Sequence, residues 1–112
     1  MANKYYCTDY YTVCLKKENG MKELKETVEM MNSKDYKERF KAEYWQTYIR
    51  YKKLTDMIDK WEKGELNFVP TCKKEIYKTQ LLHMANYLSI LRTRAKIEKV
   101  DLGIEEENEK DC

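Results

Sequence analysis

The segment GELNFVP, residues 64–70, separates two long stretches that both carry a helical pattern. It contains Gly64 and the only proline of the chain, Pro70, and these two residue types interrupt helices most strongly. With three glycines in 112 residues, the chain has few other places to end a helix. A linker this short places its flanking helices side by side and antiparallel. The sequence therefore predicts an all-α fold built on a hairpin of two long helices.

The first long helix is expected to run from about residue 35 to residue 63. Asp35 is its predicted N-cap, Glu38 would complete a capping box, and Gly64 is the predicted C-terminal stop. Apolar side chains recur every three or four positions and predict one buried stripe. These are Phe40, Tyr44, Tyr48, Tyr51, Leu54, Ile58 and Trp61.

The second long helix is expected to open at Thr71 or Cys72 and to continue to about Lys99. Its apolar residues alternate between spacings of four and three, as in a coiled coil. They are Tyr77, Leu81, Met84, Leu88, Leu91 and Ala95. We expect this stripe to face that of the first helix.

These helices divide the chain into a hairpin at residues 35–100, an N-terminal extension at 1–34 and an acidic, solvated, disordered tail at 101–112. Within the extension, four apolar residues at helical spacing predict a short amphipathic helix of about three turns. They are Met21, Leu24, Val28 and Met31. Before it, YYCTDYYTVC at residues 5–14 is rich in β-forming residues but shows no clear alternation, so residues 1–19 are compatible with strand or helix.

Composition excludes several classes of function. The 22 Lys and Arg residues against 20 Asp and Glu leave a net charge of +2, which argues against binding long nucleic acids. No apolar run approaches the ~20 residues of a membrane span, and no signal peptide is visible. Cys7, Cys14, Cys72 and Cys112 have no metal-ligand spacing, so free thiols in a cytoplasm are expected. With one histidine, His83, and no catalytic motif, we expect no enzyme activity, metal or cofactor.

The stretch KAEYWQTYIRYKK, residues 41–53, contains four large aromatic rings. On a helical wheel, Trp45 falls about 100° from Tyr44 and Ile49 about 140°, so both lie off the stripe that meets the second helix. One interpretation is that the helix at residues 21–31, or another protomer, covers them. The other is a ligand-binding ledge, in which rings stack on a base and ammonium groups meet a phosphate. Its members would be Tyr48, Trp45, Lys41 and Lys52.

Near the end of the second helix, LRTRAK supplies Arg92, Arg94 and Lys96. Cations in a last turn complement the helix dipole, which is a structural explanation for all three. A role in phosphate binding stays open, because a guanidinium is a planar, bidentate donor.

The motifs DYKER, KKL and KWEKGELNF on the first helix and turn, and QLLHMANYLSILRTR on the second, carry a resemblance. Over roughly residues 35–97 the chain resembles small helical-hairpin proteins of bacteriophages, including crAss-like phages. That family is distantly similar to phage anti-CBASS sponges, which assemble into homo-oligomers and sequester cyclic oligonucleotide messengers of bacterial defence. The resemblance implies a protein of the bacterial cytoplasm that binds a cyclic di- or trinucleotide and does not cleave it.

The resemblance also implies particular ligand-binding residues. A tyrosine near the start of the first long helix stacks on a base in such sponges, and Tyr36 in DYKER occupies the matching position. Lys53 in KKL matches a ligand-contacting lysine, with Lys52 as a neighbouring alternative, and Arg94 in ILRTR matches an arginine of the second helix. Because Lys53 lies about 180° from Tyr44 on the wheel, a site that uses it must be completed by another subunit.

Two functions are therefore kept open. The first is a phage anti-defence sponge that holds cyclic oligonucleotides in pockets between subunits. The second is a small phage interaction protein that docks on a host or phage protein through an exposed aromatic helix face formed by Trp45 and Ile49.

Overall fold

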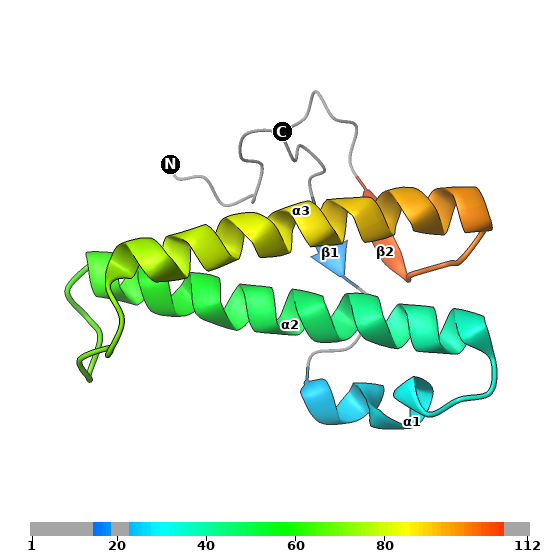
Figure 1. The fold of residues 1–112 in the computed structure, drawn as a ribbon, viewed down its shortest axis with the longest axis horizontal. Coiled ribbons are helices and arrows are strands. Elements are labelled where there is room, and N and C mark those ends of the chain that lie inside the picture. Colours follow the sequence, from blue (N-terminus) through cyan, green and yellow to red (C-terminus); the bar gives the residue numbers. More distant parts are fainter. Residues whose placement is uncertain (1–14, 19–22, 107–112) are drawn as a thin grey trace.

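The structure is a computed structural model that describes residues 15–18 and 23–106. Two long helices, α2 (Tyr36–Glu62) and α3 (Lys74–Glu98), lie side by side and antiparallel along the longest axis (Figure 1). The predicted helical hairpin is therefore confirmed. No helix in the described part of the chain is both long enough and apolar enough to span a lipid bilayer.

The ends of α2 follow the sequence signals, with one difference. The Asp35 carboxylate accepts a hydrogen bond from the backbone N–H of Lys37 at 3.0 Å, as an N-cap should. Glu38, however, does not complete the capping box. The N–H of Asp35 donates instead to the Ser33 hydroxyl at 3.0 Å, and Glu38 forms an ion pair with Lys41. At the other end, Gly64 has φ +74°, the left-handed conformation that commonly stops a helix.

Helix α3 begins two or three residues later than expected, because Thr71 and Cys72 lie in the bends that follow Pro70. Its C-terminus is closed by Lys99, which adopts φ 60° and donates its N–H to the Ala95 carbonyl. This is the left-handed position that glycine usually occupies. Gly103 also has positive φ but turns the chain four residues farther on.

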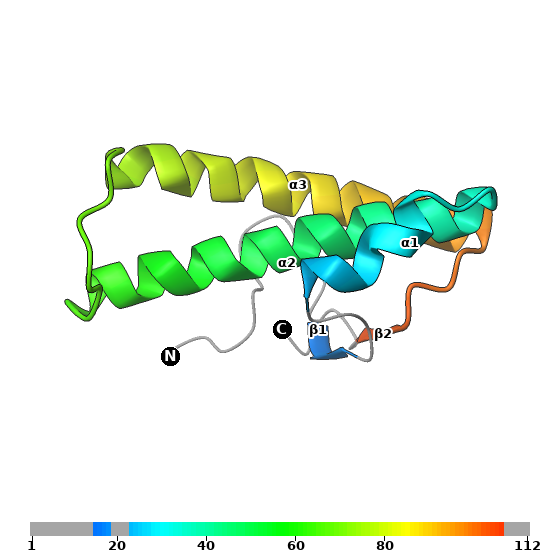
Figure 2. The same cartoon turned by 90° about the horizontal axis from the view of Figure 1, so that it is seen from below.

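The predicted helix at residues 21–31 is shorter and is wound differently. It consists of a 3-10 turn, η1 (Leu24–Thr27), followed by one turn of α-helix, α1 (Val28–Met31). A 3-10 turn has 3.0 residues per turn, so the inward face shifts from the expected stripe. Thr27 is fully buried, whereas Val28 and Met31 are exposed, and Met21 lies outside the described residues. Both short elements pack against α2 (Figure 2).

A short strand pair adds the only β-structure among the described residues. Strand β1 (Leu15–Glu18) pairs antiparallel with β2 (Ile104–Glu106), with Glu18 opposite Ile104. The order therefore continues past residue 101, into the part of the chain for which a solvated tail was expected. The preceding residues 1–14 and the final residues 107–112 lie outside the described part.

Most of the buried apolar residues lie toward the end of the hairpin where α2 starts and α3 finishes. There the first half of α2, the last turns of α3 and the returning segment 100–104 enclose one apolar core. Its members are Phe40, Tyr44, Trp45, Tyr48, Leu88, Leu91, Ala95, Val100 and Leu102. Toward the linker fewer residues between α2 and α3 are buried. There Trp61 contacts Tyr77 edge to face, with 6.1 Å between the ring centroids. The two predicted stripes thus meet, but unequally along their length.

Candidate functional site

The first residue of α2 and the last residue of α3 are joined by their side chains. The Tyr36 hydroxyl donates a hydrogen bond to a carboxylate oxygen of Glu98. Arg94, one turn before Glu98, donates to the same carboxylate from Nε at 2.8 Å and from a terminal nitrogen at 3.2 Å. Glu98 therefore holds Tyr36 and Arg94 beside one another, although the two belong to different helices.

Phe40 packs against the guanidinium of this arrangement. The Arg94 guanidinium lies over the Phe40 ring, 4.7 Å from its centroid, and a guanidinium is attracted by the face of an aromatic ring. Lys37 adds a second tie between the helices by donating to the Lys99 carbonyl at 3.2 Å. We refer to Tyr36, Phe40, Arg94 and Glu98 as the Tyr36 cluster.

The protonation of the Tyr36 cluster follows from these contacts. The pKa of Glu98 lies below its usual value, mainly because its carboxylate accepts hydrogen bonds from Arg94 and, with a smaller effect, from Tyr36. The hydrogen bond to Glu98 raises the pKa of Tyr36, because it stabilises the protonated phenol and the carboxylate disfavours a second negative charge beside it. At neutral pH the cluster consists of a neutral phenol, a carboxylate and a guanidinium.

Tyr36 and Arg94 are also the most exposed residues of the cluster. The Tyr36 residue is 44% exposed, and the Arg94 side chain 45%. A half-exposed ring beside a guanidinium can stack on a planar base while the cation meets a phosphate oxygen. The structure thus brings together two of the residues that the resemblance implied.

The expected ledge of Tyr48, Trp45, Lys41 and Lys52 is not formed. Trp45 is 1% exposed and Tyr48 5%, and both belong to the apolar core. The Trp45 indole donates to the Leu102 carbonyl at 2.9 Å, so the returning segment covers this face. Neither ring can stack on a ligand without unpacking the core. Lys41 and Lys52 stay at the surface, where they pair with Glu38 and Asp56 respectively.

The exposed aromatic face required by the second function is likewise absent from the described surface. Ile49 is 4% exposed, and Trp45 is buried as described above. The first interpretation of KAEYWQTYIRYKK was closer, because other parts of the chain cover these residues. It missed, however, that the segment after α3 covers Trp45.

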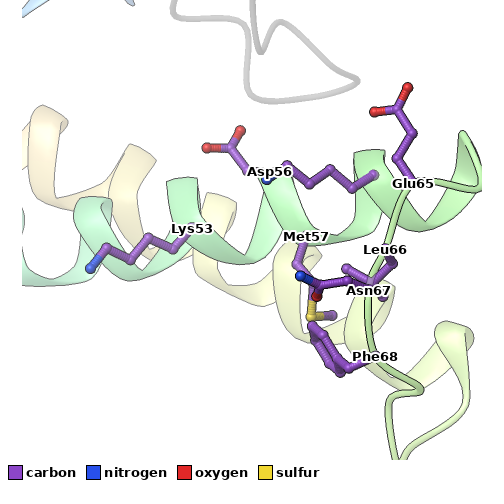
Figure 3. Close-up of a pocket in the computed structure, with 8 residues that line it drawn as sticks. Lys53, Asp56, Met57, Glu65, Leu66, Asn67 and Phe68 are labelled. Atoms are coloured by element: carbon purple, nitrogen blue, oxygen red, sulfur yellow. The ribbon is translucent and has the colours of Figure 1, made fainter.

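Lys53 lies in another part of the molecule. It lines an open pocket of about 270 Å³ between α2 and the linker, together with Met57, Asn67 and Phe68. Figure 3 shows the ammonium group of Lys53 extending along α2, away from the linker residues. Phe68 is 53% exposed at the edge of this pocket.

Tyr36 and Lys53 cannot contact one small ligand from the same chain. They are 17 residues apart on one continuous helix, which corresponds to roughly 25 Å at the rise of an α-helix. Tyr36 and Arg94 form one location, and Lys53 forms another. A single pocket that contains all three residues requires a second copy of the chain.

Sequence reasoning missed Glu98 and placed Phe40 only in the buried stripe, although these two residues hold the cluster together. The spacing of Arg94 and Glu98, four apart on a helix, was a usable signal for their ion pair. The contact of Glu98 with Tyr36 joins residues 62 positions apart and has no local signal. Within the described ranges, no three His, Cys, Asp or Glu side chains gather closely enough to hold a metal ion.

The described residues define a small helical-hairpin protein with a tyrosine and arginine pair held at one end of the hairpin. The chain belongs to the Sequestin family, whose profile matches residues 34–97, more than half of its length. The matched region includes α2, the linker and nearly all of α3, and therefore contains Tyr36, Lys53 and Arg94. No curated protein and no solved structure matches the chain.

Proposed function

We propose that this protein is a sponge that binds cyclic oligonucleotide second messengers and sequesters them without cleavage. The family name denotes sequestration, and the family profile covers the whole region that carries the candidate ligand-binding residues. The observation that carries the proposal is the Tyr36 cluster, in which a half-exposed ring and a guanidinium are fixed side by side. The resemblance to phage sponges adds an origin in a bacteriophage and a role against bacterial defence.

In the proposed complex, the Tyr36 ring stacks on one base of a cyclic di- or trinucleotide. Arg94 turns one edge of its guanidinium to a phosphate, while Glu98 keeps the helix ends in register. Such binding relies on stacking and charge neutralisation and leaves every covalent bond of the ligand intact. No catalytic residue is assigned.

The proposed functional unit is a homo-oligomer. The separation of Tyr36 and Lys53 supports this, because a ligand that contacts both must lie between two copies. Lys53 of the second copy would then supply a cation to the phosphate that faces away from Arg94.

The proposal is tested by isothermal titration calorimetry of the purified protein with cyclic di- and trinucleotides and with their linear analogues. The ligand is then recovered from the denatured complex and identified by chromatography. Tight binding of a cyclic nucleotide that is recovered unchanged supports a sponge. Recovery of a linear product would instead make the protein an enzyme, and absence of binding across the panel would refute the proposal.

The chain offers a matched control for Tyr36. Tyr87 is 41% exposed, and its hydroxyl donates across the hairpin to the Glu43 carboxylate, just as Tyr36 donates to Glu98. Tyr87 lies outside the Tyr36 cluster. Loss of binding in Tyr36→Ala with retention in Tyr87→Ala therefore separates a role in the ligand site from a general effect of losing a surface tyrosine.

A further inference from the structure

Arg92 is a buried cation for which the described part of the chain provides little compensation. The residue is 6% exposed, in the last third of α3. Within the described residues, the guanidinium donates one hydrogen bond, to the Tyr44 hydroxyl, and its length of 3.4 Å is long for such a bond. Its Nε is buried and has no hydrogen-bond partner. No carboxylate among the described side chains of residues 23–104 pairs with it, whereas Arg94, two positions later, is paired twice with Glu98.

Burying Arg92 in this way is unfavourable unless another group supplies a negative charge or a hydrogen-bond acceptor to the guanidinium. A buried charge is normally paired, because its removal from water is otherwise uncompensated. A buried donor without an acceptor adds its own desolvation cost. An arginine placed only for packing would therefore be less favourable here than methionine or leucine.

Arg92 also lines a hollow that could hold the missing partner. The hollow has a volume of about 290 Å³ and lies between the last turns of α3 and the returning segment 100–104. Ala95, Val100, Leu102 and Ile104 form apolar walls, and Lys96 brings a second basic side chain to the lining. Among the described lining residues the acidic one is Asp101, and its carboxylate accepts a hydrogen bond from the N–H of Gly103 at 2.9 Å.

We infer that this hollow is an oxyanion-binding site, in which the Arg92 guanidinium receives a phosphate or carboxylate group. Both groups present two oxygens at the spacing of the guanidinium fork. The apolar walls lower the local dielectric constant and so strengthen the attraction. The Tyr44 hydroxyl orients the guanidinium by accepting a hydrogen bond from it.

This site is distinct from the Tyr36 cluster and does not depend on the proposed function. Residues 92 and 94 are separated by about 200° around the α3 axis. Arg94 accordingly lies over Phe40 and pairs with Glu98, while Arg92 lines the hollow. The oxyanion can therefore be inorganic, or a phosphate of a larger ligand, without any contact with Tyr36.

The test records the Nε–H resonance of Arg92 by nuclear magnetic resonance while inorganic phosphate is added at constant ionic strength, with chloride as the reference salt. Phosphate is expected to shift this resonance saturably and to raise the melting temperature, since it binds only the folded chain. In Arg92→Met, which keeps a side chain of similar length without the charge, the rise should disappear. Arg50→Met removes an exposed arginine with a partnered Nε and should keep the response.

Further titrations determine which oxyanions the site accepts and whether it is independent of Tyr36. A shift with acetate as well as phosphate indicates a general oxyanion site, whereas a shift with phosphate alone indicates a phosphate site. Tyr36→Ala should retain the phosphate response even if it loses cyclic nucleotides, which separates this inference from the proposed function. An unmoved Arg92 resonance in the native protein would overturn the inference, and so would an equal thermal response in Arg92→Met.

Discussion

Tyr36 and Glu98, the first residue of α2 and the last residue of α3, are joined by a side-chain hydrogen bond. This contact closes the end of the hairpin that lies opposite the linker, and Arg94 reinforces it through the same carboxylate. It also brings an aromatic ring and a guanidinium to one exposed location.

Removal of the Tyr36 ring should weaken ligand binding much more than removal of its hydroxyl. A stacked base contributes roughly 1–3 kcal/mol, so Tyr36→Ala should raise the Kd of a cyclic nucleotide roughly 5- to 150-fold. Tyr36→Phe keeps the ring and loses only the bond to Glu98, so its Kd should change much less. Calorimetric titration of both variants beside Tyr87→Ala measures the difference. Equal losses in the Ala and Phe variants would show that the ring does not stack.

Lys53 and Tyr36 should act from different subunits. Lys53→Ala and Tyr36→Ala should each bind weakly alone, because every site then lacks one contact. When the two variants are mixed and allowed to exchange subunits, some sites receive Tyr36 from one chain and Lys53 from another. Binding should then partly recover in the calorimeter. A mixture that binds no better than its two components would contradict a shared site, provided that native mass spectrometry shows mixed oligomers.

The closed end of the hairpin should weaken in acid. The folded-state pKa of Glu98 lies below its unfolded value, because Arg94 and Tyr36 donate hydrogen bonds to its carboxylate. A depressed pKa contributes stability that is present above the usual value of a glutamate and is lost as the pH falls through the folded value. The melting temperature should therefore drop more in the native protein than in Glu98→Gln as the pH is lowered across this range. Parallel curves for the two proteins would show that Glu98 contributes no such stability.

Trp45 should be a structural residue. Trp45→Phe leaves the Leu102 carbonyl without its indole donor in a buried position and should lower the free energy of unfolding by about 1–3 kcal/mol or more. Trp61→Phe, at the thinner end of the seam, should have a smaller effect because Trp61 is only half-buried. Urea denaturation followed by circular dichroism measures both. Nearly native stability in Trp45→Phe would contradict the assignment of this residue to the core.

Local signals in the sequence were sufficient for the hairpin itself. Asp35, Gly64 and Pro70 mark the helix ends, and the spacing of the apolar residues identifies the seam. The position of Trp45 shows the limit of this reasoning. A helical wheel places Trp45 off the seam but does not show what covers it. The covering residues belong to the returning segment 100–104, in which Leu102, 57 positions from Trp45, accepts the hydrogen bond from its indole.

The candidate site was likewise predictable from the sequence only in part. Tyr36 and Arg94 were inferred from motifs, while the residue that unites them, Glu98, depends on a contact between the two ends of the hairpin. Arg92 was assigned a role only as part of a basic helix end. Its burial beside Tyr44 depends on how α3 and the returning segment pack, and no periodicity in the sequence encodes that.

The most direct test of the central claim is calorimetric titration of native protein and Tyr36→Ala with a panel of cyclic di- and trinucleotides, with chromatography of the recovered ligand. The account predicts saturable binding of at least one cyclic nucleotide by the native protein, a marked loss in Tyr36→Ala, and recovery of the ligand unchanged. Binding that is unaffected in a folded Tyr36→Ala variant, or no binding of any cyclic nucleotide by the native protein, would contradict it.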